Sequence, residues 1–464
     1  MRCVSISGNA VAENKSEKHR SYPVILLFLL IGISAAAAAK VNSGGFHGVD
    51  EEERLSGTGE ITMQSEFDPV AIFLTWQHDP TSTMTIDWHT TPDQDRHLES
   101  ILHYREMGSR GWNVTQGTFH SFPHSDRIIH RVELRRLNPA TTYEFRFGYH
   151  SKVYKFRTMP ADLDTPVRFV TGGDTSHERH EMSVVAMTYD PDFILWGGDL
   201  AYADGHPHRV ERWYGWFDGI KENLISEDGR VVPILLTIGN HELIQIQRLE
   251  NQMTEDELGD FLIKYNLWDY KTTFFFDLFA FPGRPEAAYG VLDFSDYMSV
   301  ILLDSDHNTD PPWSSVTGPQ KAWLEAVLHE RVDIPHVFPI YHMPAFPSHR
   351  MPDSWPTNIR VREHWVPLFE EYGIRVVFEN HDHTYKRTHP IRNGEISPDG
   401  VVYIGDGNWG RNPRSGENRD AWYIDRFESN RHGIVVTITN EKQEYLMVND
   451  QGEIFDTYTI QINP

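Results

Sequence analysis

Short apolar runs in the later two-thirds of this 464-residue chain lead directly into residues that can bind a metal ion. Five of these runs read VRFVTGGD, FILWGGD, PILLTIGNH, HVFPIYH and RVVFENHDH. Apolar, β-branched runs of this length predict buried strands, and the helix-like patterns between them predict a sheet covered on both faces. From residue 161 onward the chain is therefore constrained to an α/β architecture.

The residues that end these runs are the candidate ligands. They are Asp174, Asp199, Asn240, His241, His342, His381 and His383. In open α/β sheets, ligands bind at the carboxyl ends of the strands. One strand that ends in Asp is more often a turn than a ligand, but five such endings in one domain favour a metal site. His381 and His383 are two residues apart, so in an extended segment they project to the same side.

The N-terminal 66 residues have a different composition. KSEKHRSYPVILLFLLIGISAAAAAK has a basic flank, an apolar core and an Ala-rich exit, which predicts a signal peptide over residues 1–39, with a retained signal anchor as the alternative. Residues 40–66 are polar and acidic and are interpreted as a linker. The only cysteine is Cys3, so a mature chain could dimerise only without a disulfide.

Residues 67–160 alternate between apolar and polar positions in short runs broken by turn residues, which predicts an antiparallel β-sandwich. LNPATTYEFRF resembles the fibronectin type III segment that carries a tyrosine corner, with Tyr143 as the corner residue and Trp88 in the core. Asn113 begins an N-V-T sequon, so we expect it to be exposed. The remainder, residues 161–464, forms the second domain.

Five short blocks carry a family resemblance: GGDTS, GGDLAY, GNHE, YHMP and NHDH. Their order and spacing resemble the calcineurin-like metallophosphoesterases, and the tyrosine of the second block resembles the purple acid phosphatases. The β-sandwich ahead of them resembles the plant-type, two-domain layout. The resemblance implies a fibronectin III-like sandwich followed by an α/β metallophosphoesterase domain of two packed mixed sheets flanked by helices.

The resemblance also implies a site with two metal ions. Fe(III) would be held by Asp174, Asp199, Tyr202 and His383, and a divalent Fe, Zn or Mn by Asp199, Asn240, His342 and His381. The residue chemistry agrees, because a trivalent ion favours anionic oxygen ligands and imidazoles suit a divalent ion. Asp199 would bridge the pair with one oxygen on each metal. His241 and His349 would be catalytic groups on the substrate side.

Several residues near the blocks have more ordinary interpretations. Glu242 either orients His241 or begins a helix, and Asp304 and Asp306 are interpreted as turn or strand-end residues. Three positions depart from the family pattern without removing a proposed ligand: Ser176, Pro339 and Asn380. Trp213, Trp216 and Phe217 are expected in the core, and His177, His180, His206 and His208 in solvated loops.

These features predict a secreted or extracytoplasmic acid phosphatase that hydrolyses phosphate monoesters through a metal-bound hydroxide. Alternatives are a phosphodiesterase or nucleotide hydrolase with the same site, a mononuclear or dimanganese hydrolase, and a binding module with a degenerate metal site. The net charge of −25 argues against a nucleic-acid partner and requires a local positive centre for any anionic substrate. We expect small phosphorylated substrates, no membrane association after signal removal, and a possible non-covalent homodimer.

Overall fold

The computed structural model describes residues 67–94, 100–148, 151–243, 254, 257, 274–282, 287–306 and 315–462. The signal peptide and linker predicted for residues 1–39 and 40–66 lie outside these ranges. Within them, no helix combines the length and the apolar character needed to cross a membrane.

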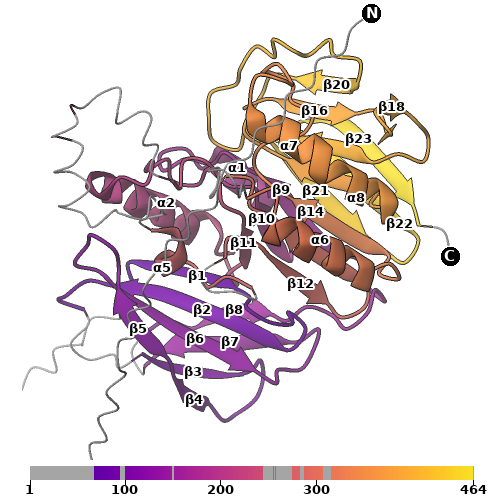
Figure 1. Cartoon of the computed structure of the whole chain (residues 1–464). Helices are drawn as coiled ribbons and strands as arrows, with labels where there is room; N and C mark the ends of the chain where they lie inside the picture. The colour runs from indigo at the N-terminus through magenta and orange to yellow at the C-terminus, as the bar shows by residue number, and fades with distance from the viewer. Residues whose placement is uncertain are drawn as a thin grey trace, which may run out of the picture. The chain divides into compact units, whose positions relative to one another are not determined.

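The N-terminal part is a sandwich of two antiparallel sheets (Figure 1). One sheet has the order β1 (Ala71–Thr75), β2 (Thr83–Thr90), β6 (Ile128–Arg135), β5 (Thr118–Ser121). The other has the order β4 (Asn113–Gln116), β3 (Ile101–Glu106), β7 (Thr142–Phe147), β8 (Tyr154–Arg157). Along β7, buried and partly exposed residues alternate, as expected of a strand with one face on the core.

Two predicted markers of the sandwich are present. The Tyr143 hydroxyl accepts a hydrogen bond from the Asn138 backbone N–H at 2.9 Å, which is the tyrosine corner. Trp88 is fully buried and stacks on His130 with ring centroids 4.9 Å apart. Asn113 lies exposed at the start of β4. The predicted all-β sandwich is confirmed.

The second part begins with a six-stranded mixed sheet. Its parallel strands β11 (Ile234–Leu236), β10 (Phe193–Trp196) and β9 (Val167–Gly172) lie in that order. An antiparallel meander, β21 (His432–Ile438), β22 (Lys442–Asn449) and β23 (Ile454–Gln461), continues the sheet beside β9. The end of the chain thus returns to complete the sheet that residue 167 begins.

A second mixed sheet has seven strands. In order these are β12 (Gly290–Phe294), β13 (Met298–Leu302), β14 (His336–Ile340), β15 (Val376–Glu379), β19 (Val402–Gly405), β16 (Tyr385–Thr388) and β20 (Ile424–Glu428). A small hairpin, β17 (Ile391–Arg392) and β18 (Glu395–Ile396), lies outside it. The two large sheets pack together. The rings of Phe169 in β9 and Phe338 in β14 meet edge to face, with their centroids 5.4 Å apart.

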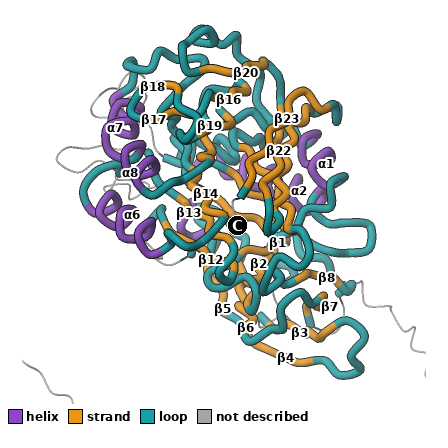
Figure 2. The backbone as a smooth tube through the Cα atoms, turned by 90° about the vertical axis from the view of Figure 1, so that its right-hand side faces the viewer, coloured by secondary structure: helices purple, strands orange, loops and turns teal. Residues whose placement is uncertain are grey.

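Helices lie on both sides of these strands: α1 and α2 on one side, and α6, α7 and α8 on the other (Figure 2). They are α1 (Glu181–Met187), the 3-10 turn η2 (Pro207–Arg209), α2 (Val210–Asn223), α5 (Phe275–Leu278), α6 (Pro319–Glu330), α7 (Pro356–His364) and α8 (Val366–Glu371). The prediction of packed mixed sheets flanked by helices is confirmed. Each apolar run that ends in a candidate ligand is a strand.

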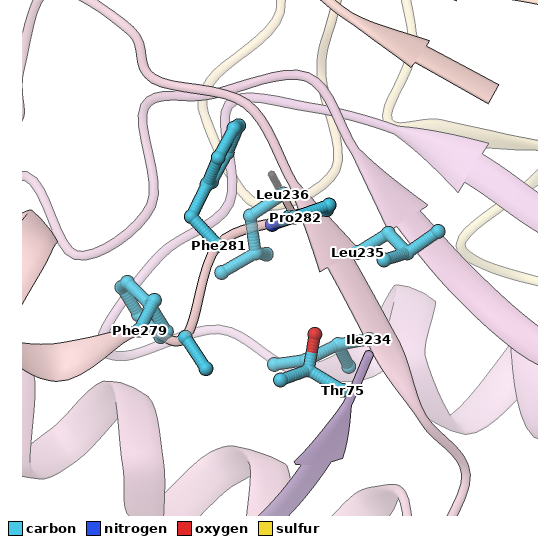
Figure 3. A pocket seen from close by; sticks show the side chains of 8 residues that line it. Thr75, Ile234, Leu235, Leu236, Phe279, Phe281 and Pro282 are labelled. Atoms are coloured by element: carbon cyan, nitrogen blue, oxygen red, sulfur yellow. The ribbon is translucent and has the colours of Figure 1, made fainter. Parts of the chain in front are cut away.

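The sandwich and the α/β part share one hydrophobic core. Phe73 of β1 stacks on Phe217 of α2 with ring centroids 5.3 Å apart, and Phe279 packs on both rings. Trp213 and Trp216 are buried in the same core, as predicted. A small pocket opens where Thr75, residues 234–236 and residues 279–282 meet (Figure 3), and it contains none of the candidate ligands.

The start of β14 contains a buried neutral histidine. His336 Nδ1 accepts a hydrogen bond from Gln443 Nε2 at 3.0 Å, and its Nε2 donates to the Thr439 carbonyl at 3.1 Å. Burial lowers the pKa of His336 to about 4. This imidazole is at the end of β14 away from His342.

Candidate metal centre

Both sheets contribute to one cluster of polar side chains at their strand ends. Asp174 follows β9, and Asp199 and Tyr202 follow β10. The other candidates come after three further strands: Asn240 after β11, His342 after β14, and His381 and His383 after β15. The meeting of these loops brings together residues up to 209 positions apart in the sequence, from 174 to 383.

Many of these residues have an unusual backbone conformation. Positive φ angles occur at Asp174 (54°), Asp199 (55°), Tyr202 (57°), His381 (85°) and His383 (56°). Non-glycine residues rarely adopt such angles, and those that do cluster at functional sites. The loops therefore hold these side chains in orientations that ordinary turns would not give.

One group of donor atoms gathers at Asp174 Oδ1. The Tyr202 hydroxyl donates to this oxygen at 2.9 Å and lies 3.0 Å from His383 Nε2. His383 Nε2 is itself 2.9 Å from Asp174 Oδ1. Burial, together with the charges of Asp174 and Asp199, raises the pKa of Tyr202 well above its usual value. Only a nearby cation would make the phenolate available as a ligand.

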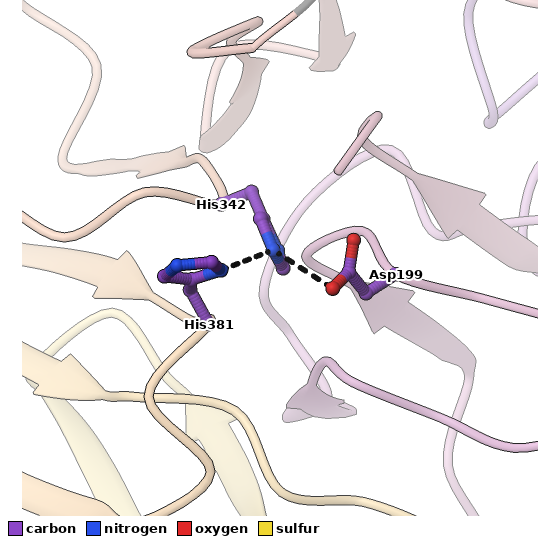
Figure 4. Close-up of side chains that lie close together, drawn as sticks. All are labelled: Asp199, His342 and His381. Carbon is purple, nitrogen blue, oxygen red and sulfur yellow. Dashed lines mark hydrogen bonds and ion pairs between the residues drawn. The ribbon is translucent and has the colours of Figure 1, made fainter. Parts of the chain in front are cut away.

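A second group of donor atoms surrounds His342 Nε2. This nitrogen lies 3.2 Å from Asp199 Oδ2, 3.2 Å from Asn240 Oδ1 and 3.1 Å from His381 Nδ1. Figure 4 shows the imidazoles of His342 and His381 and the Asp199 carboxylate converging on one point. The other ring nitrogen of His342 donates to the Gly197 carbonyl at 2.8 Å, which leaves the Nε2 lone pair directed at the cluster.

The chemistry of the donor set fits metal ions. Asp199, His342 and His381 are buried, and their ligand atoms are close enough to bind one ion. His381 Nε2 is buried without a hydrogen-bond partner among the described residues, so its Nδ1 is the nitrogen that faces the cluster. Asp199 Oδ1 accepts the backbone N–H of His241 at 2.8 Å. The other oxygen, Oδ2, faces His342 Nε2, and the bridge by Asp199 stays a prediction.

Glu242 fixes the two loops that hold Asp199 and Asn240. Its buried carboxylate accepts the backbone N–H groups of Asp199, Leu200 and Gly239, each at 2.8 Å. Gly239 is required there, because a Cβ would collide with the backbone nitrogen and Oδ1 of Asp199. From the sequence we expected Glu242 to orient His241 or to begin a helix. Its carboxylate instead joins these loops, and a helix after it would lie in residues 244–253, outside the described ranges.

His241 lies beside the first donor group. Its Nδ1 pairs with the Asp204 carboxylate, and its ring lies 4.2 Å from the ring of Tyr202. Nε2 is 3.7 Å from Asp199 Oδ2, so this nitrogen faces the candidate ligands. The pairing of Asp204 with His241 was not predicted from the sequence. The position of Asp204, two residues after Tyr202 of the GGDLAY block, could have suggested it.

His349 is held close to the loop of His381 and His383. Its backbone N–H donates to Asp382 Oδ2 at 2.7 Å, and the same buried carboxylate pairs with Arg350. Among the described residues, His349 Nδ1 is buried without a hydrogen-bond partner. Asp382 thus positions the backbone of His349. Asp382 lies between the candidate ligands His381 and His383 in the sequence, and its role was not predicted.

A buried ionic network lies below these loops. Lys386 Nζ is 2.5 Å from Glu379 Oε2 and 3.5 Å from Asp406 Oδ1, and all three side chains are inaccessible to solvent. Glu379 Oε1 accepts the Ala345 N–H at 2.6 Å, and Asp406 Oδ2 accepts the Ser348 N–H at 2.9 Å. The network therefore fixes the loop after β14 to the ends of β15 and β19.

Two further sequence features, the acids after β13 and Asn380, occupy ordinary positions. Asp306 donates its backbone N–H to Asp304 Oδ1 at 2.8 Å, which is the predicted turn after β13. Asn380 is buried, and its side-chain amide donates to the Tyr341 carbonyl at 2.9 Å. Asn380, which differs from the family pattern, is therefore accommodated by a hydrogen bond to Tyr341.

Comparison with known proteins agrees with the fold. Residues 69–158 match the family model described as the N-terminal domain of purple acid phosphatase, and residues 175–385 match the calcineurin-like phosphoesterase model. Purple acid phosphatase 15 of Arabidopsis thaliana is 26% identical over 391 residues, covering 75% of this chain and 68% of the relative. Purple acid phosphatase 21 of the same plant is 26% identical over 329 residues, covering 68% of each chain.

Among solved structures, a purple acid phosphatase from yellow lupin (Lupinus luteus) seeds is similar with a TM-score of 0.66 and 16% identity, covering 85% of this chain and 74% of the other. The structure of PhoD is similar with a TM-score of 0.61 and 13% identity, covering 85% and 91%. The second domain is that of a calcineurin-like phosphoesterase. With its N-terminal domain, the chain belongs to the two-domain purple acid phosphatases, a family of phosphatase enzymes with a binuclear metal site.

Proposed function

We propose that this chain is a binuclear, metal-dependent acid phosphatase that hydrolyses phosphate monoesters. The observation that carries the proposal is the pair of donor groups, one at Asp174 Oδ1 and one at His342 Nε2, formed by buried side chains from both sheets. The family relationship supports it independently.

The two groups divide the proposed ligands between two ions. Asp174, Tyr202 and His383 would hold Fe(III) together with Asp199, because a phenolate and two carboxylates suit a trivalent ion. The second ion, a divalent Fe, Zn or Mn, would be held by Asp199, Asn240, His342 and His381. When bound, such a pair supplies Lewis acidity toward the phosphoryl oxygens and lowers the pKa of water.

The histidine beside the donor groups supplies the proton. Asp204 accepts from His241 Nδ1 and so orients the ring, leaving Nε2 on the side of the candidate ligands. A protonated Nε2 stabilises the phosphoryl oxygens and protonates the departing ester oxygen. His349 is proposed as a second imidazole on the substrate side, positioned through Asp382. Because these histidines act as imidazolium, we expect maximal activity at acidic pH.

The same proposal covers localisation and partners. The basic, apolar and Ala-rich pattern of residues 1–39 supports secretion or another extracytoplasmic location. Small phosphorylated compounds are the expected substrates, and a homodimer of the mature chain would be non-covalent because Cys3 lies in the signal segment.

Metal content and the visible spectrum of the purified protein test the proposal, with hydrolysis of p-nitrophenyl phosphate measured in parallel. We expect about one iron and one divalent metal per chain and a purple tyrosinate band that disappears in Tyr202→Phe. Tyr143→Phe, in the sandwich, is the matched control and should keep the band. Two manganese or zinc ions without colour would refute Fe(III) and the acid optimum. A metal-free protein would favour a binding module with a degenerate site.

A further inference from the structure

A cavity lies at the end of the second sheet that is away from the candidate metal centre. Its volume is about 340 Å³, which is within the range of small-molecule sites. It is lined by Leu328, residues 331–335 and 372–375, Val337, Gln443 and Ile462. The strands β14 and β15 begin at this cavity, whereas His342 and His381 follow their opposite ends. Because a five-residue strand such as β14 spans roughly 16 Å, a small molecule in the cavity would not contact the candidate metal ligands.

The lining of this cavity combines apolar and polar surface. Leu328, Ile374 and Ile462 are buried residues that supply the apolar part. Gln443 is also buried, and its side-chain amide donates to His336 Nδ1 at 3.0 Å. The cavity can therefore hold an organic molecule that has an apolar body and at least one polar group.

Arg375 gives the cavity a positive charge that the described carboxylates do not neutralise. Its Nη1 donates to the Gln461 carbonyl at 3.0 Å, and among the described residues no carboxylate lies within 4.0 Å of the guanidinium. The other arginine of the lining, Arg331, is paired with Asp293 at 2.7 Å. Asp333, the acidic residue of the lining, is exposed and is not paired with Arg375. One cation without a counterion indicates a ligand with one negative charge.

The charge of Arg375 also acts on a buried imidazole next to the lining. Burial is the main reason that the pKa of His336 falls to about 4, and the Arg375 charge lowers this pKa further. The Gln443 amide joins His336 to the cavity. An anion bound at Arg375 would offset the guanidinium charge and so raise the pKa of His336. The imidazole therefore provides a readout of this cavity that does not depend on catalysis.

We propose that this cavity is a second ligand site, which binds a small organic carboxylate through Arg375. A guanidinium donates two parallel hydrogen bonds to a planar carboxylate, and a single guanidinium matches one negative charge better than the two of a phosphate ester. The apolar body of the ligand packs on Leu328, Ile374 and Ile462. This site is separate from the metal centre, so the inference does not rest on the proposed phosphatase activity.

Calorimetry on the full, metal-loaded chain tests the site with two matched probes, benzoate and its neutral analogue benzamide. Orthophosphate is present throughout, so that it occupies the metal centre. We expect benzoate to bind at least about tenfold more tightly than benzamide, and Arg375→Gln to lose about tenfold or more of the affinity for benzoate, because a charge-assisted pair of hydrogen bonds is lost. Arg426→Gln, at an exposed position of β20, is the matched control and should bind both probes as the wild type does.

The NMR titration of His336 gives a second readout, with His336→Gln identifying its resonance. Benzoate should raise the pKa of His336 in the wild type and leave it unchanged in Arg375→Gln. Equal affinity of the wild type for benzoate and benzamide, equal affinity of the wild type and Arg375→Gln for benzoate, or no saturable binding below about 10 mM would overturn the site. The comparison of the two probes uses the wild type alone, so it decides even if thermal unfolding shows that Arg375→Gln is unstable.

Discussion

Replacing Lys386 by methionine removes the cation that pairs with Glu379 and Asp406 in the buried network that fixes the loops of the candidate site. Lys386 Nζ lies 2.5 Å from Glu379 and 3.5 Å from Asp406. At an effective dielectric constant of about 20, unit charges at 2.5 and 3.5 Å attract by about 7 and about 5 kcal/mol. Desolvation of the three charges offsets most of this attraction. The substitution leaves two buried carboxylates without a cation, which costs about 3–5 kcal/mol.

The assay is urea unfolding of the metal-loaded protein, followed by tryptophan fluorescence. We expect Lys386→Met to reduce the free energy of unfolding by about 3–5 kcal/mol and to lower phosphatase activity, because the loop after β14 loses its attachment. Combining it with Glu379→Gln should restore about 1–2 kcal/mol, since the amide removes one unpaired charge and still offers an oxygen to Ala345.

A surface ion pair provides the control. Lys442 lies 2.8 Å from Glu444 at partly exposed positions, so Lys442→Met should cost less than about 1 kcal/mol. The reasoning is refuted if Lys386→Met is as stable as this control. It is also refuted if the double variant is less stable than Lys386→Met alone.

Three further perturbations test other parts of the molecule. His336 has a pKa of about 4 in the folded protein, below its unfolded value of about 6.5, so its stabilising contribution is present above pH 6.5 and is lost as the pH falls toward 4. The free energy of unfolding of the wild type should fall by up to about 3 kcal/mol across this pH range, and it should fall less in His336→Gln. Equal pH profiles of the two proteins would contradict the low pKa of His336. Gly239→Ala should lower activity by at least about tenfold while the sandwich stays folded, because the new methyl group displaces Asp199, and full activity with normal metal content would show that the loop adapts. Tyr143→Phe should cost about 1–2 kcal/mol by calorimetry, because the Asn138 N–H loses its acceptor, and an unchanged melting temperature would argue against the tyrosine corner as a stabilising contact.

The sequence predicted those parts of the fold that are determined by residues close together in the chain. The apolar runs before Asp174, Asp199 and His342 are strands because burial on both faces selects β-branched and aromatic residues. Tyr143 was recognised because its hydrogen bond is local, to the backbone five residues upstream. The C-terminal meander, β21 to β23, was not predicted. Its place beside β9 depends on a pairing across more than 260 residues, from 167 to 438, that no local pattern records.

At the site, the candidate ligands could be identified from the sequence, but their supporting contacts could not. Asp204 and Asp382 act through pairs with His241 and Arg350, and those pairs form only when separate loops meet. Glu242 was expected either to orient His241 or to begin a helix, whereas its carboxylate accepts backbone N–H groups of another loop. Sequence distance is a poor guide to such contacts, because carboxylates bind whichever donors tertiary structure brings near.

The core shared by the sandwich and the α/β part has a consequence for how this chain could be divided or recombined. Phe73 belongs to the first domain by sequence and Phe217 to the second, yet their rings are stacked inside one cluster. A chain cut near residue 160 would leave α2 with an uncovered aromatic face, which favours aggregation. The sandwich thus covers apolar surface of the α/β part. If either part were exchanged with that of a relative, the aromatic residues on both sides of their contact would have to be exchanged together.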